Sequence, residues 1–546
     1  MLEEIKTIIK GEVSFDAKEL LAYSRDASIF EIRPRVVVSP KNVEDLKKLV
    51  VWTSAHKGEF PDLSLTIRSA GTDMSGGPLN DSIILDMTKH FKHVEAGRHS
   101  AVAEPGVYYR DFEKETLKKN LLLPSYPASR EICTIGGMVA NNAGGEKSLR
   151  YGKTADYVEE LNVVLSDGNE YVFKVLNHEE LRQKKSQNDF EGELYRKIHE
   201  LLMTNNQLLQ KAKPGVSKNS AGYALWDILK EGSLDLTKLI TGSQGTLGII
   251  TKVKLRLIKP KKYSKLIVIF LKKLDRLGDL VVDLNKYQPE SMESYDDNTF
   301  KLTLKILPDL IKKIDLGVLF RFIPDSWAML TGGIPKMVIL AEFTGDEEEG
   351  VEHKVQSVKR DIDLKFKVKA RIAKSEADIQ KYWTIRRESF NLLRKHIKGK
   401  KTAPFIDDII VKPEHLPEFL PELNKILNNY ENYMTHTITG HPGDGNFHII
   451  PLMDLADEKS RAIIPELSEK VYDLVIKFGG SITAEHNDGL IRTPYLEKMY
   501  GAEVYNLFKE VKQIFDPQNI FNSGKKVPLA GLGQVGSLNY AMKHIN

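Results

Sequence analysis

The stretch TIGGMVANNAGGEKSLRYG, residues Thr134–Gly152, is dominated by glycines and other small residues. Side chains of this size fill little space and build little hydrophobic core. Three larger apolar residues, Ile135, Met138 and Val139, interrupt the run, which is not typical of a flexible linker. A backbone that wraps around a large flat ligand explains this composition better, so the stretch predicts a ligand-binding segment.

A second glycine-rich stretch, RSAGTDMSGG, lies upstream at residues Arg68–Gly77. It follows a predicted strand, so its backbone can turn sharply and present successive N–H groups to a phosphate. Thr72 and Ser75 would add hydroxyl donors, and Arg68 would add a fixed positive charge. The stretch matches neither GxGxxG nor GxxxxGK[ST], so it has neither the nicotinamide motif nor the P-loop motif. On its own, such a loop is equally well explained as a surface turn.

The segments around these glycines alternate between strands and helices. RPRVVVSP and SIILDM are typical of short buried strands, whereas KNVEDLKKLVVWTSAHKG has helical periodicity. YVEELNVVLSDGNEYVF is typical of a hairpin that turns at SDG. A third glycine stretch, GSQGTLGII, ends in apolar residues suited to packing beside an aromatic ring system. This order predicts a mixed nucleotide-binding domain of strands and helices.

The character of the chain changes near Lys259, where KPKKYSKLIVIFLKKL opens a run of lysine-rich strands and helices. We place a domain boundary there. Further on, residues 303–335 are more apolar and aromatic than their neighbours, with scattered cations at Lys312, Lys313 and Arg321. This segment is explained either by a pair of core helices or by an insertion that lies on a membrane surface or docks a partner.

Length and composition exclude several classes of protein. A chain of 546 residues is expected to form two or three domains, and 41% hydrophobic with 28% charged residues is ordinary for a soluble enzyme. The net charge of +4 does not by itself suggest nucleic acid binding. A single cysteine, Cys133, excludes an internal disulfide framework and an iron–sulfur cluster held by this chain alone. We find neither a signal peptide nor an apolar run of about 18 residues, so we expect a cytoplasmic protein.

HPGDGNFH, residues His441–His448, carries two histidines and an acid among glycines and a proline. The proline and glycines argue against a helix, and on a straight strand an odd separation would place the two imidazoles on opposite faces. A tight loop that reverses the chain would let them converge, although a lone histidine is more often a surface or core residue.

Downstream, GGSITAEHNDGLIRTPYL places Glu485 beside His486. A carboxylate that meets two imidazoles would form a His₂Glu site with positions open to substrate, suited to zinc or another divalent metal. His486 would then be left free as an acid–base group, because imidazole titrates nearest neutral pH. The alternative is a plain surface loop.

The three glycine stretches resemble the FAD-binding domain of the vanillyl-alcohol oxidase type flavoproteins, the PCMH-type domain. More narrowly, they resemble the branch that contains D-lactate dehydrogenase, the glycolate oxidase flavin subunit and D-2-hydroxyglutarate dehydrogenase. RSAGTDMSGG resembles the pyrophosphate loop, and TIGGMVANNAGGEKSLRYG the second flavin segment. KNSAGYAL and GSQGTLGIIT also fit, with Gln244 where the family often has glutamate. Thr72 and Asp73 stand where relatives with covalent flavin carry a histidine, which implies non-covalent FAD.

The resemblance implies an α+β fold. It implies a two-subdomain PCMH-type FAD-binding domain over residues 1–258, a cap or substrate domain over residues 259–525 on an antiparallel sheet with flanking helices, and a tail over residues 526–546. The last part of the cap domain is expected to pack back on the FAD domain. FDPQNIFNSGKK resembles the closing DPxxxxNPGK stretch of the family, with Ser523 in place of the usual proline. The cofactor-binding residues carried over are Arg68, Ser69, Gly71, Thr72, Asp73, Ser75, Gly76, Pro127, Thr134, Gly136, Gly137, Asn141, Gly144, Gly145, Tyr151, Gly152, Gly248, Ile249, Ile250 and Asn522.

The histidine and glutamate stretches extend the resemblance. HPGDGNFH resembles the family's GHxGDGNxH segment, and AEHNDG its GEHGxG segment, with Asn487 in place of a typical glycine. In relatives these residues bind a divalent metal, which implies His441, His448 and Glu485 as metal ligands, with zinc as the expected metal. The resemblance also implies that His486 is the catalytic base.

WTIRRESF, residues Trp383–Phe390, resembles the WxxR segment of the family's substrate domain. Arginine offers a planar fork for two-point contact with a carboxylate, so Arg386 is the candidate anchor and Arg387 the alternative. Without the resemblance, this position is equally well explained as a solvated charge on a helix. Asp407 and Asp408 are expected to be structural, because a second carboxylate would repel that of the substrate.

These residues lead to the hypothesis of a FAD-dependent dehydrogenase that oxidises a D-2-hydroxy acid to the 2-oxo acid. The metal would polarise the hydroxyl, His486 would remove its proton, Arg386 would orient the carboxylate, and hydride would pass from the α-carbon to flavin N5. Ile450 stands where the 2-hydroxyglutarate branch often has asparagine. This difference favours a small monocarboxylate such as D-lactate or glycolate.

With one cysteine, the chain cannot carry its own cluster relay, so electrons must pass to a separate acceptor. The acceptor could be a quinone, an electron-transfer flavoprotein, a cytochrome or an iron–sulfur subunit. Leu316–Leu330 is the candidate contact with the acceptor. A peripheral contact of the protein with the inner face of the membrane is a further expectation. The alternatives are a flavin oxidase or transferase of the same fold, a metal-dependent hydrolase, and a binding protein that keeps a degenerate flavin fold. No nucleic acid partner is expected.

Overall fold

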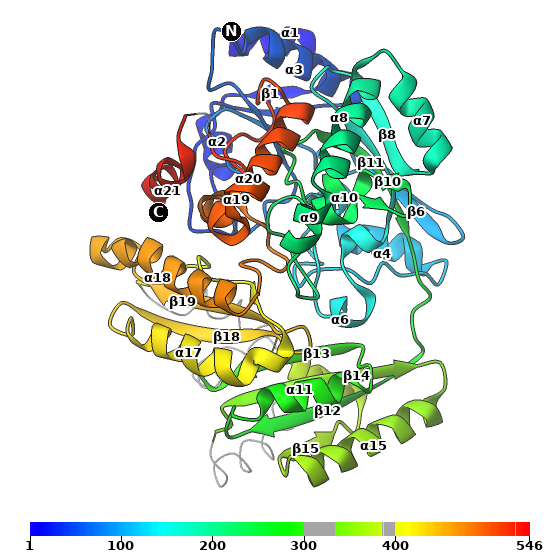
Figure 1. Ribbon diagram of the computed structural model, residues 1–546, viewed down its shortest axis with the longest axis vertical. Coiled ribbons are helices and arrows are strands. Elements are labelled where there is room, and N and C mark those ends of the chain that lie inside the picture. Colours follow the sequence, from blue (N-terminus) through cyan, green and yellow to red (C-terminus); the bar gives the residue numbers. More distant parts are fainter. Residues whose placement is uncertain (300–333, 385, 387–398, 530) are drawn as a thin grey trace.

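The structure is a computed structural model, and it describes residues 1–299, 334–384, 386, 399–529 and 531–546. Within these residues, three β-sheets organise the chain (Figure 1). Two sheets and their helices form the upper body in this view, which also holds both ends of the chain, and the third sheet forms the lower body. Helices pack beside mainly antiparallel sheets, which confirms the predicted α+β fold.

The first sheet is small and largely parallel, with the strand order β1-β2-β4-β3. Its strands are β1 (Glu12–Ser14), β2 (Val36–Ser39), β3 (Leu65–Arg68) and β4 (Ile83–Asp86). β4 pairs in parallel with both β2 and β3, whereas β1 is antiparallel to β2. β2 and β4 are buried throughout, as expected for strands that are apolar on both faces.

The second sheet has seven strands in the order β5-β6-β11-β7-β8-β10-β9, and its pairings are antiparallel. Its strands are β5 (Val94–Ala96), β6 (Ser100–Ala103), β7 (Val158–Val164), β8 (Glu170–Leu176), β9 (Leu229–Lys230), β10 (Ser233–Asp235) and β11 (Ile249–Arg256). The predicted hairpin at SDG is present, because β7 and β8 pair directly across that turn.

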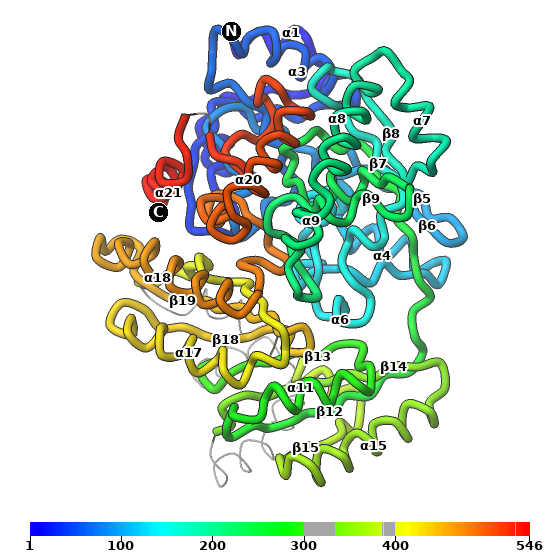
Figure 2. The backbone as a smooth tube through the Cα atoms, in the orientation of Figure 1, coloured from blue at the N-terminus to red at the C-terminus, as the bar shows by residue number. Residues whose placement is uncertain are grey.

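The third sheet has eight strands in the order β15-β12-β14-β13-β18-β19-β16, and β17 also pairs with β19. Its strands are β12 (Tyr263–Leu271), β13 (Ser291–Asp296), β14 (Met337–Gly345), β15 (Lys369–Ile372), β16 (Lys401–Thr402), β17 (Ile409–Ile410), β18 (Met434–His441) and β19 (Asn446–Met453). The tube in Figure 2 shows the chain descending into this sheet after β11 and returning to the upper body after α18.

Helices cover the sheets, and those beside the first two sheets belong to residues before β12 or after β19 (Figure 1). The α-helices are α1 (Ile5–Ile8), α2 (Ala17–Ala22), α3 (Val43–His56), α4 (Tyr109–Leu117), α5 (Ile135–Asn141), α6 (Ser148–Tyr151), α7 (His178–Ser186), α8 (Phe190–Thr204), α9 (Asn206–Ala212), α10 (Thr237–Ile240), α11 (Leu277–Asn285), α15 (Glu348–Lys365), α17 (Leu416–Asn428), α18 (Glu458–Lys477), α19 (Gly489–Arg492), α20 (Leu496–Phe515) and α21 (Gly533–Lys543).

The opening glycine stretch is not one continuous loop, because α5 and α6 lie within it. The hydroxyl of Thr134 caps α5 by accepting from the N–H of Gly137. Ile135, Met138 and Val139 are buried in the main core, so the three apolar residues that interrupt the small ones are packing residues.

The end of the chain is fixed to its beginning. The N–H of Leu65 donates to the carbonyl of Ile520, and Phe30 forms a β-bridge with Ile545. α21 packs beside α19, so this helix of the tail belongs to the upper body (Figure 1). In the part of the chain that the structure describes, no helix combines the length and apolar character needed to cross a membrane. Most of the predicted apolar segment 303–335, including Leu316–Leu330, lies outside the described residues.

A fully buried ion pair joins the closing segment to the loop after Glu485. The ammonium of Lys526 lies 2.8 Å from a carboxylate oxygen of Asp488, and both side chains are 0% exposed. The same ammonium donates to the carbonyls of Ser220 and Gly222 at 3.0 and 2.6 Å. Three distant parts of the chain therefore meet at one cation.

We predict that Lys526→Met destabilises the protein by about 3–5 kcal/mol, because it leaves the carboxylate of Asp488 buried without its cation. Urea unfolding followed by tryptophan fluorescence measures the effect. Lys470→Met is the control, because Lys470 forms its ion pair with Glu466 at the surface and should leave the urea midpoint almost unchanged. Equal midpoints for the two variants would contradict the importance assigned to the buried pair.

Candidate functional site

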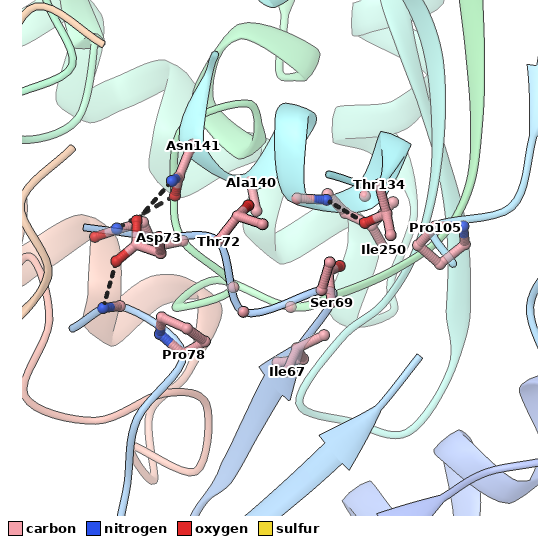
Figure 3. A pocket seen from close by; sticks show the side chains of 18 residues that line it. Ile67, Ser69, Thr72, Asp73, Pro78, Pro105, Thr134, Ala140, Asn141 and Ile250 are labelled. Atoms are coloured by element: carbon pink, nitrogen blue, oxygen red, sulfur yellow. Dashed lines mark hydrogen bonds between the residues drawn. The ribbon is translucent and has the colours of Figure 1, made fainter. Parts of the chain in front are cut away.

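A pocket lies where the first glycine loop, α5 and the third glycine stretch meet (Figure 3). The empty space in the pocket and at its open side amounts to about 740 Å³. The wall is built mostly from glycines, small side chains and backbone, so a flat ligand can lie close to the chain. Its lining residues are Ile67, Ser69, Ala70, Gly71, Thr72, Asp73, Gly77, Pro78, Pro105, Thr134, Gly136, Gly137, Ala140, Asn141, Gln244, Gly245, Gly248 and Ile250.

Asp73 holds the first glycine loop in shape. Its Oδ2 accepts from the N–H groups of Ser75 and Gly77, both at 2.9 Å. Its Oδ1 accepts from Nδ2 of Asn141 at 2.7 Å (Figure 3). The N–H of Gly76 donates to Asp26. One carboxylate thus fixes the turn of the loop and ties the loop to the end of α5.

The predicted cofactor residues divide into two groups by position. Half of them line the pocket, namely Ser69, Gly71, Thr72, Asp73, Thr134, Gly136, Gly137, Asn141, Gly248 and Ile250. The others lie outside its lining, namely Arg68, Ser75, Gly76, Pro127, Gly144, Gly145, Tyr151, Gly152, Ile249 and Asn522.

Two members of the second group, Asn522 and Arg68, hydrogen-bond to the backbone of the pocket or of segments next to it. Nδ2 of Asn522 donates to the carbonyls of Gly77 and Gln244 at 3.0 and 2.7 Å. Arg68 differs from the expectation of a charge aimed at a phosphate, because its guanidinium donates to the backbone carbonyls of Tyr23 and Arg25. It therefore secures the segment that carries Asp26.

The two histidines of HPGDGNFH lie on the paired strands of a β-hairpin. β18 ends at His441, β19 begins at Asn446, and these two residues pair across the turn. His448 pairs with Thr439, two residues before His441, so both imidazoles lie on one face as diagonal neighbours. Their ring centres are 5.2 Å apart and nearly perpendicular. The predicted convergence is thus produced by strand register together with the turn.

Asp408 places the loop that carries Glu485 and His486. Its Oδ2 accepts from the N–H of Glu485 at 2.8 Å, from the N–H of His486 at 2.7 Å and from the hydroxyl of Thr483 at 2.6 Å. Asn446, at the start of β19, donates to the other oxygen. The carboxylate therefore joins the loop to the histidine hairpin.

Two further carboxylates orient the imidazoles. Glu293 hydrogen-bonds Nδ1 of His441 through Oε1, and Asp407 lies 3.2 Å from Nδ1 of His448. Asp407 also lies 2.8 Å from Nδ1 of His486, but out of line for an N–H···O hydrogen bond, so we treat that contact as electrostatic. The rings of His448 and His486 are stacked, with centres 4.9 Å apart.

These carboxylates favour positive charge on the imidazoles. Burial alone would lower the pKa of His441, but the carboxylate of Glu293 outweighs it and raises the pKa to about 9. Burial also opposes protonation of His486, yet Asp408 and Asp407 raise its pKa to about 9. A bound divalent cation would supply the same positive charge.

A buried lysine completes this group of charges. The ammonium of Lys218, 2% exposed, lies 2.6 Å from Oε1 of Glu485 and 3.0 Å from Oδ2 of Asp444. Burial would raise the pKa of Glu485, but Lys218 and His441 hold that pKa well below its usual range. Glu485 is therefore ionised, with Oε2 turned towards Nε2 of His441 at 3.6 Å.

The donor set fits a divalent metal. Nε2 of His441 and Oε2 of Glu485 face one another, and His448 has Nδ1 bonded to a carboxylate, the arrangement that leaves Nε2 for a metal. Asp408, His448, Glu485 and His486 also bring one possible ligand atom each within 4.8 Å of one another. We favour His441 over Asp408 as the third ligand, because one oxygen of Asp408 already accepts three hydrogen bonds.

The pocket and the histidine cluster are contiguous. Nδ2 of Asn487 donates to the carbonyl of Asn141 at 3.2 Å and to that of Gly242 at 2.8 Å, and Asn141 lines the pocket. Asn487 has φ of 67°, a left-handed conformation that asparagine adopts more readily than most residues, so it can replace glycine here. A ligand in the pocket therefore lies beside the loop that carries His486.

Arg386, in a helical segment, contacts the same cluster through Glu293 of β13. Its Nε donates to Oε2 of Glu293 at 2.9 Å, and its side chain is largely buried. Arg386 and His441 are thus both bonded to the same carboxylate, that of Glu293. Arg387, the alternative anchor, lies outside the described residues.

Reasoning from the sequence missed several residues of this site. Glu293 and Lys218 stand far from the histidines in the chain, and no local motif indicated them. Asp407 and Asp408 were expected to be structural, and Asp408 does hold the backbone, but Asp407 contacts two histidine side chains. Two adjacent acids inside the apolar run FIDDIIV are unusual, and this was the available signal in the sequence.

Comparison with known proteins gives two matching family models. Residues 260–526 match the FAD linked oxidases, C-terminal domain, and residues 34–173 match the FAD binding domain. The chain is 27% identical to a D-2-hydroxyglutarate dehydrogenase of Pseudomonas putida over 94% of this chain, and it spans about half the length of that relative. It is 26% identical to glycolate oxidase subunit GlcD of Bacillus subtilis, covering 95% of this chain and 94% of that one.

Further likenesses are similar in strength. A D-lactate dehydrogenase of Archaeoglobus fulgidus is 26% identical, over 94% of this chain and 95% of that one. Among solved structures, 4-ethylphenol oxidase from Gulosibacter chungangensis superposes with a TM-score of 0.69 at 15% identity, covering 97% of both chains. p-Cresol methylhydroxylase superposes with a TM-score of 0.68 at 15% identity, covering 97% of this chain and 96% of that one. At this identity the two structures show a common fold.

We predict that Gly445→Ala disrupts the histidine hairpin. Gly445 has φ of 75°, and a Cβ there would lie 1.9 Å from the carbonyl oxygen of Val411. Gly232→Ala is the matched control, because Gly232 has φ of 79° and open space around it. The control should cost about 1–2 kcal/mol of stability from backbone strain alone, and Gly445→Ala about 1–3 kcal/mol more. Urea unfolding compares the two variants. Equal losses in the free energy of unfolding would show that the hairpin accommodates the added Cβ and would contradict the prediction.

Proposed function

Because the chain belongs to the FAD-linked oxidases, with a FAD binding domain and their C-terminal domain, we propose that it oxidises a D-2-hydroxy acid to the 2-oxo acid. The observation that carries the proposal is the contact between the pocket wall and the histidine loop through Asn141 and Asn487. This contact supports His486 as an acid–base group beside the place where a flavin would lie. The relatives named for D-2-hydroxyglutarate, D-lactate and glycolate support the substrate class.

The chain's own residues would divide the work as follows. His486 would remove the proton of the substrate hydroxyl once a divalent metal, in place of a ring proton, supplies the positive charge that Asp407 and Asp408 favour. Its Nδ1 faces Asp407, and its other ring nitrogen is left for the substrate. Arg386 would hold the carboxylate by two-point contact. His441, His448 and Glu485 would hold a divalent metal, with zinc as the expected ion, which lowers the cost of ionising the hydroxyl.

The flavin would be FAD held without a covalent bond. When bound, FAD supplies the acceptor for the hydride that leaves the α-carbon. The first glycine loop offers Thr72 and Asp73 where a histidine would form a covalent link, which supports non-covalent binding. The ten predicted residues that line the pocket are the proposed contacts, and Asn522 and Arg68 would act through the backbone that they hold.

A small monocarboxylate, D-lactate or glycolate, is the favoured substrate. Ile450 lies two residues after His448 on β19, so both side chains point to the same face of the strand. An apolar side chain beside the metal histidine offers nothing to a second carboxylate. This supports a short substrate over a dicarboxylate such as 2-hydroxyglutarate.

The electron acceptor would be a separate molecule, because the single cysteine cannot hold an iron–sulfur relay. A quinone, an electron-transfer flavoprotein, a cytochrome or an iron–sulfur subunit remains the proposed acceptor. The domain division at residue 258, the cytoplasmic location and the peripheral membrane contact stay predictions. A metal-dependent hydrolase would leave the FAD binding domain without a role.

We predict that purified protein is yellow and that its flavin absorbance is bleached anaerobically by D-lactate or glycolate. His486→Ala should keep its FAD but lose at least about 100-fold in the rate of bleaching, because a positioned base contributes about 10²–10⁴-fold. Reduction by dithionite is the control for a functional flavin. Wild-type protein that no D-2-hydroxy acid bleaches, or a His486→Ala variant with normal turnover, would overturn the proposal.

We further predict that Ile450→Asn shifts the preference towards D-2-hydroxyglutarate. The amide can donate to a second carboxylate, whereas the isoleucine side chain excludes one, so the ratio of kcat/KM for D-2-hydroxyglutarate over D-lactate should rise about tenfold or more. Ile450→Val is the matched control and should keep the wild-type ratio. An unchanged ratio in Ile450→Asn would remove this residue from the specificity argument.

A further inference from the structure

We propose that Glu293 is a positioning residue shared by the metal site and the substrate site. Its one buried carboxylate fixes the orientation of both His441, the proposed metal ligand, and Arg386, the proposed substrate anchor. The inference rests on the proposed function, which assigns His441 to the metal and Arg386 to the substrate carboxylate. It goes further by coupling the two sites through a residue that touches neither the metal nor the substrate.

Strand register brings Glu293 to His441. β13 runs antiparallel to β18, with Ser294 opposite Gly440 and Tyr295 opposite Thr439. Continued by one residue, the same register places Glu293 opposite His441, and directly opposed residues project to the same face. The hydrogen bond between Oε1 of Glu293 and Nδ1 of His441 is therefore built into the sheet.

The second oxygen of Glu293 is committed to Arg386. Oε2 accepts from Nε at 2.9 Å, and the glutamate side chain is 2% exposed. A guanidinium held through Nε has a fixed plane, which sets the direction in which it can meet a carboxylate. Movement of Glu293 would therefore shift His441 and Arg386 together.

Only a carboxylate can serve both partners. Glutamate offers two acceptor oxygens, one for each donor, whereas glutamine has one acceptor and one NH₂ donor. In Glu293→Gln the NH₂ would face either the N–H of Arg386 or Nδ1 of His441. The first arrangement opposes two donors, and the second puts the imidazole hydrogen on Nε2, the nitrogen proposed to bind the metal.

Asp407 provides a matched comparison on the other side of the metal site. It bonds Nδ1 of His448 at 3.2 Å and lies beside His486, as Glu293 bonds Nδ1 of His441. Its carboxylate contacts these two histidines, and the backbone carbonyl of the same residue accepts from Arg492. Asp407→Asn should therefore disturb the metal site without disturbing Arg386.

The experiment uses the FAD-loaded protein stripped of metal with a chelator. Zinc affinity is measured by calorimetric titration, and carboxylate affinity by the change in flavin absorbance on titration with propionate, which has the carboxylate of D-lactate but no hydroxyl to oxidise. In Glu293→Gln we expect the Kd for zinc to rise about 10–100-fold. We expect its Kd for propionate to rise about tenfold as well.

In Asp407→Asn the Kd for zinc should rise to a similar extent, while the Kd for propionate stays at the wild-type value. FAD content and the urea midpoint are measured for each variant. If Glu293→Gln fails to retain FAD, Glu293→Asp replaces it, because the shorter carboxylate keeps the charge but cannot reach both partners. The same double loss is then expected.

Loss of zinc affinity alone in the Glu293 variants would overturn the coupling, as would an equal loss of propionate affinity in Asp407→Asn. Wild-type protein that binds no zinc would overturn the inference together with the metal site. Wild-type protein that binds zinc and propionate, but whose flavin no D-2-hydroxy acid bleaches, would overturn the proposed function. In that case the double loss in Glu293→Gln would still support Glu293 as the shared positioning residue.

Discussion

The site depends on the buried carboxylate of Asp408. Through one oxygen it accepts from the N–H groups of Glu485 and His486 and from the hydroxyl of Thr483, and its own carbonyl accepts from Ala484. Four consecutive residues are thus held by a single residue that directly precedes β17 of the third sheet. The third sheet also carries the histidine hairpin. These hydrogen bonds of Asp408 therefore hold Glu485 and His486 close to His441 and His448. Lys218 adds a second link between the two halves, because it pairs with Glu485 and with Asp444 of the histidine hairpin.

Charge burial then makes the arrangement specific. Several acids are removed from water at this place, and each has a cation or an imidazole beside it, as Asp444 has Lys218 and Glu293 has Arg386. Such pairs add little net stability, because desolvation offsets most of their attraction, but removing one partner is costly. The result is a cluster that tolerates few alternative packings. A site that must hold an ion, a carboxylate and a base in register requires that property.

The sequence predicted the strands and turns that carry this site better than it predicted which residues come together in space. Strands such as VVVS and the SDG hairpin follow from local apolar patterns and turn residues, and the structure has them. Convergence of His441 and His448 depends on strand register, which spacing alone cannot supply. Glu293 lies 148 residues from His441, and Lys218 lies 267 residues from Glu485, so no local pattern could join them. The sequence also does not reveal in which direction a side chain points. The guanidinium of Arg68, for example, donates to backbone carbonyls.

Gln244 shows how a departure from a family pattern follows from its surroundings. A Cβ at Gly77 would lie 2.7 Å from Nε2 of Gln244 and 3.2 Å from Oδ2 of Asp73, so the two side chains are close neighbours. Oε1 of Gln244 accepts from Gly489, while Nε2 donates to Asn141 at 3.3 Å. A glutamate here would keep the first bond, lose the second and place a second carboxylate beside that of Asp73. With an aspartate organising the loop, a neutral amide at 244 is the side chain that satisfies both neighbours without like-charge repulsion.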